Sequence, residues 1–448
     1  MPLTRRTKAV AGAAVLAVAL VVAILRVTTF SQLFGVRLAM PRPLNDFKAA
    51  VYCPVKVFVN GGNPYDRDQL LQSCPRAVYC RVSDLAEDKT SQAGEREPCI
   101  PTDVFPPYLP ATLLLHAPFA ALSIDAAALA YFLLNVSFSI VVVLFALRLT
   151  GKPLAPGVVL LGAGLLLLSR PGQWNLLLGQ SALELTVATY IALFRAERAP
   201  QVSGLALAVA AYKPTFGIPL GALMLARGNA RAVWWGVAWL TCLNLPPALL
   251  LLERAGGATS FLKDLAQSQG AYQAVNTPAN QVYSVDLPSL VSRWIGTWIS
   301  PAWYGLLTVL VLGITGRALW ALRSTPAGEA SRLSASLVCV GMLLSIHHNA
   351  YDLVLLVAPI AFVIQRSLPG VLRERGTRYG LLAVAAVLAC NYVTTQSVLH
   401  HLEGHRLAWL VLASLNGGLL LVMFGVLVVS AMSYARSPGS GAPAPDDR

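Results

Sequence analysis

Asp46 is the acidic residue best placed for chemistry in this sequence. It lies in the run Pro43-Leu44-Asn45-Asp46-Phe47-Lys48, shortly after the first long apolar segment, where the chain becomes polar. A carboxylate held at the mouth of a membrane-embedded cavity could take a proton from a hydroxyl group as a general base. Asp46 could also be the N-cap of a helix that begins at Phe47, and the two roles are compatible.

Two adjacent histidines form a second candidate centre. His347 and His348 precede Asp352 at the boundary of another apolar segment. Imidazoles in such a place suit proton transfer, contact with a phosphate group or metal binding. Two neighbouring histidines alone are a weak metal signal, so we assign no metal ligands and leave a divalent cation open.

Other polar side chains fall at the ends of apolar segments. They are Lys48, Asp66, Arg170, Gln173 and Gln180, and Lys213 lies near membrane depth. Ionisable residues in a membrane protein commonly mark a pathway or a site, so we expect these groups to share one polar cavity. Simpler roles stay open for two of them, because Asn63-Pro64-Tyr65-Asp66 has the composition of a turn and Gln180 can bond between helices.

The elements that must position these residues are membrane helices. Of the 448 residues, 56% are hydrophobic and only 12% are charged, whereas soluble proteins carry about 25% charged residues. Repeated apolar stretches of about 20 residues predict helices, whose backbone groups are satisfied within each segment. We therefore expect an all-α polytopic membrane protein with eleven or twelve membrane segments, some of them broken or re-entrant.

The net charge of +13 does not indicate nucleic acid as a partner. The cations cluster in short loops and follow the positive-inside rule, which places the N-terminus in the cytoplasm and the chain in the plasma membrane as a multi-pass protein. The apolar run 10–27 could instead be a signal peptide. Its length, and the lack of a clear small-residue cleavage site, favour an uncleaved first helix.

The expected organisation is a first transmembrane helix (1–30), an extracytoplasmic loop with interfacial helices and Asp46 (31–125), a multi-helix transmembrane domain (126–434) and a disordered cytoplasmic tail (435–448). Within the loop, the run 113–122 is too short to span and is expected at the interface. Residues 173–180 are expected as an external turn. The last two spans are expected at 379–398 and 407–434.

A proline interrupts the apolar run 203–226. Lys213-Pro214 lies at its centre, and proline breaks a helix at the preceding residue. Two half-helices would return Arg227 to the side from which the run starts, as the charge pattern requires. We therefore expect a re-entrant hairpin or two short tilted spans here. A further amphipathic segment is expected at 287–295, in a large external loop.

The seven cysteines fall into two groups. Cys242, Cys339 and Cys390 lie inside apolar segments and are expected as ordinary core residues. The others lie in the first external loop, where an oxidising environment favours two disulfides of undetermined pairing: Cys53, Cys74, Cys80 and Cys99. A zinc site is the alternative, but the spacing and the lack of a nearby histidine make it a poor ligand set.

An ordered set of short motifs runs through the chain. After Asn45-Asp46-Phe47-Lys48 come Gly61-Gly62-Asn63-Pro64-Tyr65-Asp66, Phe105-Pro106-Pro107-Tyr108, Gly179-Gln180, Ala211-Tyr212-Lys213-Pro214, Asn280-Gln281 and Ser345-Ile346-His347-His348-Asn349-Ala350-Tyr351-Asp352. In this order they resemble the polyprenyl-phosphate-sugar-dependent glycosyltransferases of family 87, which have the GT-C fold. The resemblance covers about 46–359. The loop cysteines and the long insertion between Asp66 and Phe105 depart from the family pattern.

The resemblance implies a donor sugar on a polyprenyl phosphate and a lipid-linked glycan or glycolipid acceptor of the cell envelope. The sugar would be mannose or arabinofuranose, transferred at the extracytoplasmic face. It implies that Asp46 is the general base and that His347 or His348 lies near the reacting groups. Substrate-binding roles are then expected for Lys48, Tyr65, Asp66, Tyr108, Arg170, Gln180, Lys213, Asn280, Gln281 and Asp352.

Two other functions fit part of the sequence. A transporter or flippase for a lipid-linked or polar solute would also use broken helices and a buried lysine, but it should place its ionisable groups near the midplane. A non-catalytic membrane scaffold would explain the hydrophobicity without the ordered polar residues. The gathering of polar residues at one face favours an inverting membrane glycosyltransferase.

Overall fold

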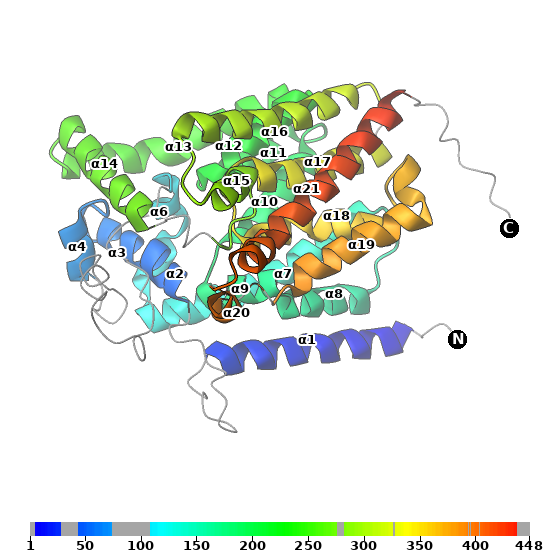
Figure 1. Ribbon diagram of the computed structural model, residues 1–448. Helices are drawn as coiled ribbons and strands as arrows, with labels where there is room; N and C mark the ends of the chain where they lie inside the picture. The colour runs from blue at the N-terminus through cyan, green and yellow to red at the C-terminus, as the bar shows by residue number, and fades with distance from the viewer. Residues whose placement is uncertain are drawn as a thin grey trace.

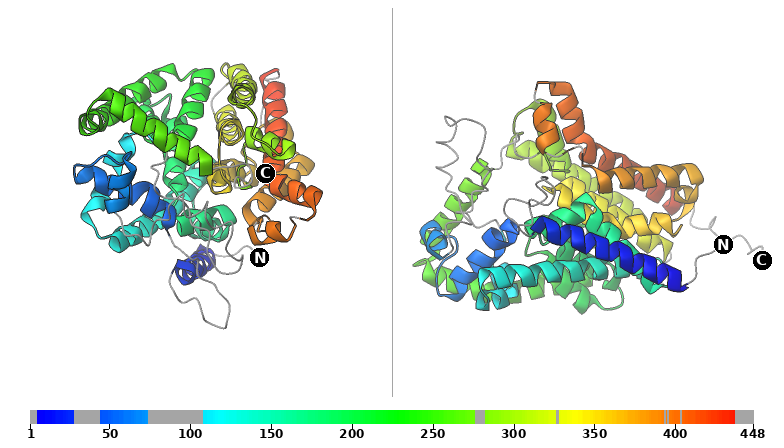
Figure 2. Two further views of the ribbon diagram at one scale, coloured as in Figure 1. Left: turned by 60° about the vertical axis from the view of Figure 1, so that its left-hand side comes forward. Right: turned by 90° about the horizontal axis from the view of Figure 1, so that it is seen from below.

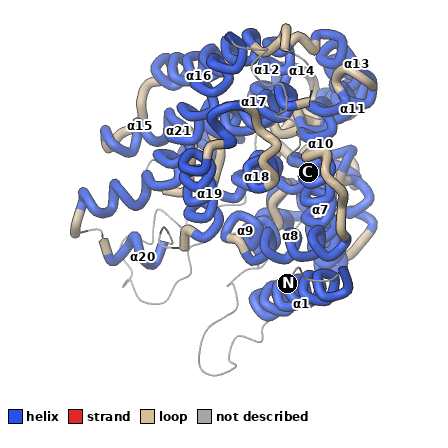
Figure 3. Tube along the Cα trace, turned by 90° about the vertical axis from the view of Figure 1, so that its right-hand side faces the viewer, coloured by secondary structure: helices blue, strands red, loops and turns tan. Residues whose placement is uncertain are grey.

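The computed structural model describes residues 5–27, 44–73, 108–275, 282–325, 328–392, 394, 396–402 and 404–436. Within these ranges the regular secondary structure is helical (Figure 3). One isolated antiparallel bridge joins Ser284 to Asn349. Five helices are long and apolar enough to cross a membrane: α1 (Arg5–Val27), α7 (Ile124–Leu149), α13 (Ala230–Arg254), α16 (Pro301–Ala321) and α21 (Arg406–Arg436). The chain is an all-α polytopic membrane protein, as its composition predicts.

Shorter helices fill the rest of the bundle. The pair α9 (Arg170–Leu178) and α10 (Ala182–Arg195) is bent by 117° and forms either one further broken span or a re-entrant loop. The others are α8 (Pro156–Leu168), α11 (Pro200–Ala210), α12 (Pro214–Arg227), α17 (Glu329–Ser345), the 3-10 helix η6 (Ala350–Leu356), α18 (Val357–Ile364), the 3-10 helix η7 (Gly370–Arg373) and α19 (Arg375–Cys390). Because a helix rises 1.5 Å per residue, helices of this length cross about 30 Å of hydrocarbon only in combination.

The break at Lys213-Pro214 is confirmed. Helix α11 ends at Ala210 and α12 begins at Pro214. At the far end of α12, Arg227 interacts electrostatically with Glu197, which lies three residues before the start of α11. The two half-helices therefore form a hairpin whose open ends face the same side of the bundle.

The two ends of the bundle differ in chemistry. At one end, where both termini lie in Figure 1, arginines bond to the ends of neighbouring helices. Arg332 donates to Leu149 O at 3.0 Å, and Arg323 donates to Ala226 O at 2.8 Å. We call this the arginine-rich end. The opposite side, at the left of Figure 1, is the Asp46 end and carries the short helices that follow α1.

Short elements cover the Asp46 end. They are α2 (Asn45–Phe47), the π-helix η2 (Lys48–Tyr52), α3 (Cys53–Val59), α4 (Arg67–Ser73), α6 (Ala111–Leu115), the 3-10 helix η5 (Ala117–Ala121), α14 (Ala258–Val275), α15 (Leu287–Ile295) and α20 (Gln396–His401). Side chains tie them together, since Lys56 donates to Ala120 O at 2.7 Å and Arg254 donates to Phe58 O at 2.6 Å. The short run at 113–122 and the amphipathic segment at Leu287–Ile295 agree with the sequence prediction.

Two local predictions are wrong, and the alternative role of Asp46 as an N-cap is excluded. Residues 173–180 are mostly helix, because Ser169 caps α9 by accepting from Gly172 N and the helix continues to a left-handed Gly179. Asp46 lies inside α2 and does not cap it, since the N-cap position belongs to Leu44. The span expected at 379–398 ends at Cys390.

Helix α1 packs at the edge of the bundle against α8 (Figure 2). Glycines bring the two backbones close. A Cβ atom added to Gly12 would lie 2.1 Å from Gly157 O, and one added to Gly157 would lie 2.4 Å from Lys8 O. Small residues at such a crossing allow the close approach on which helix association in lipid depends. This contact fixes α1, the helix that precedes the segment with Asp46.

Candidate active site

The chain turn before α2 places Asp46 against the bend between α9 and α10. Leu44 has a left-handed backbone (φ 58°), and its N–H donates to Leu177 O at 2.6 Å. Gly179 ends α9 with φ +72°, and a Cβ atom there would lie 2.6 Å from the Cβ of Phe47. A glycine is therefore required at this position for two reasons, backbone conformation and space.

Asp46 is half-buried and hydrogen-bonded. Gln180, directly after the bend, donates from Nε2 to Asp46 Oδ2. Burial raises the pKa of Asp46 to about 6, and the Gln180 hydrogen bond and the charge of Lys213 oppose that rise. Both partners favour the carboxylate over the neutral acid. Asp46 is thus mostly ionised at neutral pH, while its proton affinity exceeds that of an ordinary aspartate, as a general base requires.

Lys213 lies at the break between α11 and α12. Its Nζ is 3.3 Å from Asp352 Oδ1, and the ammonium lies 5.2 Å from the ring centroids of Phe216 and Tyr351. The lysine is buried and its partner Asp352 is almost fully so. A buried pair of this kind fixes the position of a positive charge in a medium of low dielectric. That charge acts on Asp46 as well.

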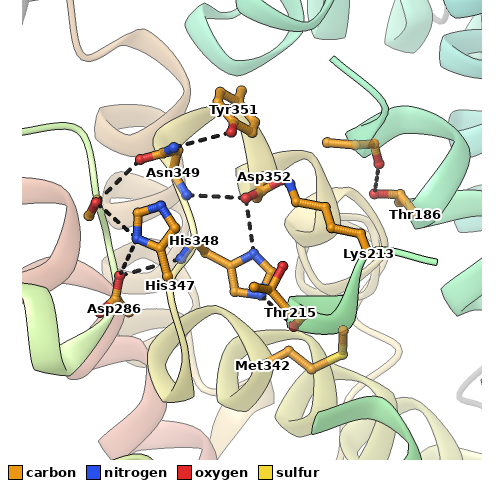
Figure 4. A network of polar contacts seen from close by, with 12 residues as sticks. Thr186, Lys213, Thr215, Asp286, Met342, His347, His348, Asn349, Tyr351 and Asp352 are labelled. Atoms are coloured by element: carbon orange, nitrogen blue, oxygen red, sulfur yellow. Dashed lines mark hydrogen bonds and ion pairs between the residues drawn. The ribbon is translucent and has the colours of Figure 1, made fainter. Parts of the chain in front are cut away.

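Asp352 connects Lys213 to His348 (Figure 4). Its Oδ2 lies 3.0 Å from His348 Nδ1 and accepts from the backbone N–H of Asn349 at 3.1 Å. The other ring nitrogen of His348 is 3.1 Å from Thr215 O. Both ring nitrogens of His348 therefore face acceptors. His348 is fully buried, so its contacts hold η6 against α12 and leave no ring nitrogen for a substrate.

His347 is placed differently. Its side chain is 28% exposed, and its Nδ1 lies 3.8 Å from Asp286 Oδ2 and 3.4 Å from Ser284 Oγ. Burial lowers the pKa of His347 although Asp286 opposes the change. Asp286 is itself fixed, because it caps α15 through Ser289 N at 2.8 Å and accepts from His348 N at 3.3 Å. His347 is therefore a neutral imidazole with one partly open face.

The remaining aromatic and turn residues support this end of the bundle. Tyr65 donates to Tyr108 O at 3.3 Å, and the ring of Tyr108 meets that of Tyr212 edge-on at 6.1 Å. Asp66 accepts from Asp68 N at 2.9 Å and so closes the first turn of α4. Its position agrees with the turn role that its motif suggests.

Two expected site residues lie apart from the others. Lys48 Nζ is 3.8 Å from Asp125 Oδ1, whose side chain is 90% exposed. Arg170 is buried, stacks at 4.6 Å on Trp174 and donates to Thr394 O at 2.9 Å. Arg170 thus ties α9 to the segment after α19, and the structure does not bring it into contact with Asp46.

Several expected residues lie outside the described ranges: Asn280, Gln281, Cys74, Cys80 and Cys99. Cys53 is buried and takes part in a disulfide bond. The described cysteines of the membrane helices, Cys242, Cys339 and Cys390, are free thiols. Cys339 is buried as predicted, whereas the prediction of a core position is wrong for Cys242 and Cys390, which are exposed on the surface of the helix bundle. In the part of the chain that the structure describes, His, Cys, Asp and Glu side chains form no group of three that could hold a metal ion.

Sequence reasoning missed four residues at the Asp46 end: Asp286, Glu184, His116 and Tyr212 as a hydrogen-bond donor. Asp286 stands before Leu287-Pro288, which is the pattern of an N-cap followed by proline in the first turn. Glu184 is an acidic residue inside an apolar segment, and that signal alone could have marked it. No local sequence pattern links His116 to Asp286 or to Glu184.

A comparison with known protein families identifies the family of the chain. The family model described as "Glycosyltransferase family 87" matches residues 105–346, which is more than half of the chain and contains Gln180, Lys213 and Asp286. The match begins after Asp46. No curated protein and no solved structure matches the chain. On the extent of the family match, the chain belongs to glycosyltransferase family 87 and is a membrane glycosyltransferase.

Proposed function

We propose that this enzyme transfers a mannosyl group from a polyprenyl phosphate to a lipid-linked glycan or glycolipid acceptor. The reaction would take place at the extracytoplasmic face of the plasma membrane, on the side of the Asp46 end. The arginine distribution supports this orientation, because short cytoplasmic loops carry an excess of basic residues. The observation that carries the proposal is the half-buried carboxylate of Asp46, held by Gln180 within reach of the Lys213 charge.

The proposed reaction is a single displacement at the anomeric carbon. Asp46 takes the proton of the acceptor hydroxyl while that oxygen forms a bond to the anomeric carbon. The bond between this carbon and the phosphate oxygen breaks, and the polyprenyl phosphate leaves with the electron pair. One displacement inverts the anomeric centre. A phosphate is a good leaving group, so the reaction needs no second carboxylic acid.

Charge builds on the phosphate oxygens as the sugar leaves. Lys213 supplies a fixed positive charge at this end of the bundle, and the partly open ring of His347 can contact the leaving phosphate. Preorganised groups of this kind, in a site shielded from water, are commonly the largest contribution to catalysis. The Lys213–Asp352–His348 network would hold both groups in place.

The test uses purified protein in lipid nanodiscs with radiolabelled polyprenyl-phosphate mannose and, separately, arabinose. Membrane-lipid extracts serve as acceptors, and NMR of the product gives the anomeric configuration. We expect transfer of mannose with inversion, and its loss in Asp46→Asn. Asp68→Asn, which changes an exposed aspartate of the same region, is the matched control. Transfer from neither donor, or retention of configuration, would contradict the proposal.

A further inference from the structure

A second carboxylate lies on α10, four residues after Gln180. The side chain of Glu184 is only 13% exposed. Its Oε1 accepts from the hydroxyl of Tyr212 and lies 3.5 Å from His116 Nε2. The other imidazole nitrogen, His116 Nδ1, is 3.0 Å from Thr112 O. Three separate elements, the end of α6, the break after α11 and the start of α10, thus converge on one carboxylate.

The two carboxylate oxygens of Glu184 differ in their contacts. Both Tyr212 and His116 approach Oε1, whereas Oε2 has no hydrogen-bond partner among the described residues. Burial alone would lower the pKa of His116, but the Glu184 carboxylate and the hydrogen bonds to Glu184 and Thr112 outweigh it and raise that pKa. The His116 imidazole and the Tyr212 hydroxyl therefore hold the carboxylate in one orientation and leave one oxygen available.

Further polar atoms around Glu184 are buried without partners. The hydroxyls of Thr112, Tyr131 and Ser181 have no hydrogen bond of normal geometry among the described residues, although Tyr131 lies near Asn135 and Ser181 lies near Tyr212. All three side chains are more than nine-tenths buried. A buried hydroxyl without a partner loses hydrogen bonds to water, so a concentration of them needs an explanation. The side chain of Glu184, which is 13% exposed, is the point at which a hydroxyl-bearing ligand could reach this polar group.

Aromatic rings surround the same group. Tyr131 stacks on Phe47, the neighbour of Asp46, with ring centroids 4.2 Å apart, and it lies 6.3 Å from the ring of His116. Tyr108 meets Tyr212 edge-on. Apolar ring faces with a few fixed polar groups are typical of small-molecule sites. The stack between Tyr131 and Phe47 also connects this group directly to the segment that bears Asp46.

We propose that Glu184 is a sugar-binding residue: its free Oε2 accepts a hydrogen bond from a hydroxyl of the donor sugar or of the acceptor sugar. This inference rests on the proposed sugar transfer and names the residue that selects the sugar. A site built to bond a hydroxyl strongly rejects an analogue that lacks it, because the polar groups of the site are then left unpaired. Glu184 is a determinant of specificity and takes no proton from the reacting oxygen.

The test is Glu184→Gln, which keeps the shape of the side chain and an oxygen that accepts from Tyr212. Glu197→Gln, on an exposed glutamate just beyond the other end of α10, is the control. We expect Glu184→Gln to raise the KM of one substrate about 10- to 100-fold, the range for a hydrogen bond to a charged group, with kcat nearly unchanged. The substrate whose KM rises, donor or acceptor, identifies the bound sugar.

A binding measurement separates this inference from the proposed function. Saturation-transfer NMR with mannose 1-phosphate and with methyl α-mannoside reports binding without turnover. Weaker binding of one probe to Glu184→Gln, with normal binding to Glu197→Gln, supports the site even if the wild-type protein transfers no mannose. Wild-type transfer with KM values and probe binding unchanged in Glu184→Gln would overturn the site and leave the proposed function standing. If neither probe binds the wild-type protein, the site is refuted.

A loss of folding would not hide the result. If Glu184→Gln melts well below the wild-type protein, Glu184→Asp provides the same test, since it keeps the charge and withdraws the carboxylate by one methylene group. We expect the same KM to rise in that variant. An unchanged KM in a folded Glu184→Asp protein would also refute the role, because a direct hydrogen bond depends on the position of the oxygen.

Discussion

Asp46 is expected to set the acid limb of the pH–rate profile. Burial raises its pKa to about 6, and a general base works only when deprotonated. The kcat/KM for sugar transfer should therefore rise tenfold per pH unit below about pH 6 and level off above it. At pH 7 about 90% of Asp46 is ionised, so the wild-type enzyme is near its plateau.

The effect of removing the base on the rate can be estimated. Asp46→Asn keeps the shape of the side chain and its contact with Gln180 but cannot take a proton. We expect kcat to fall about 100- to 10,000-fold, which corresponds to about 3–5 kcal/mol in the activation barrier. The residual rate should have no limb near pH 6.

Two lysines allow the electrostatic argument to be tested separately. Lys213 favours the carboxylate of Asp46 and so lowers its pKa. Removing this charge in Lys213→Met should raise that pKa and move the acid limb above pH 6, whereas Lys213→Arg should leave it in place. Lys48 is closer in sequence but pairs with the exposed Asp125, so Lys48→Met should not move the limb.

The assay measures initial rates of transfer from labelled polyprenyl-phosphate mannose in nanodiscs between about pH 5 and about pH 8, a range that brackets the limb. Gel filtration of each variant gives the folded fraction. Near-normal turnover in Asp46→Asn would remove Asp46 from the role of base. A limb that moves equally in Lys48→Met and Lys213→Met would refute the assignment of the Lys213 charge to this site.

The remaining predictions concern stability. Because the folded-state pKa of Asp46 is about 6 and the reference value is 3.8, ionisation of Asp46 destabilises the fold. Above pH 6, Asp46→Asn should therefore have a higher free energy of unfolding than the wild-type protein, by at most about 3 kcal/mol, and a higher melting temperature. Below about pH 4 the two proteins should not differ. His348→Gln should lower the melting temperature, since it breaks the fully buried contact with Asp352, while His347→Gln should melt normally and lose activity; equal melting temperatures would contradict this division. Gly157→Leu should detach α1 from α8, seen as faster proteolysis of α1, and unchanged protection would show that the close glycine contact is dispensable.

The membrane helices and their interruptions could be predicted from local sequence. Apolar length marks a span, and proline or glycine marks its end, so the break at Pro214 and the segment Leu287–Ile295 follow from a few neighbouring residues. Residues 173–180 were harder, because an apolar helix that bends by 117° at Gly179 has the same composition as a turn between two spans. A single glycine does not distinguish the two.

The division of roles among the candidate residues could not be predicted, because it depends on contacts between distant parts of the chain. His347 and His348 are adjacent in sequence, yet one is partly open and the other has both ring nitrogens engaged. Arg170 is expected from the sequence to bind substrate, but its guanidinium donates to Thr394 O. The contact of His116 with Glu184 joins residues from different elements and leaves no local pattern.

The distribution of these contacts also bears on the choice between sugar transfer and transport. The helix breaks near Gln180, Lys213 and His348 meet at the Asp46 end, where free backbone carbonyls take part in the polar network. Thr215 O, for example, lacks its usual helical donor because Pro219 has no N–H, and it accepts from His348. At the arginine-rich end the last carbonyls of α12 accept from Arg323 instead, as expected of basic side chains at a helix C-terminus. A transporter needs its polar groups near the midplane, with access from both sides. Here the polar network lies at one end of the bundle. At the other end of the same hairpin, the last carbonyls of α12 are already hydrogen-bonded to Arg323. The arrangement therefore favours an enzyme that acts on one face of the membrane.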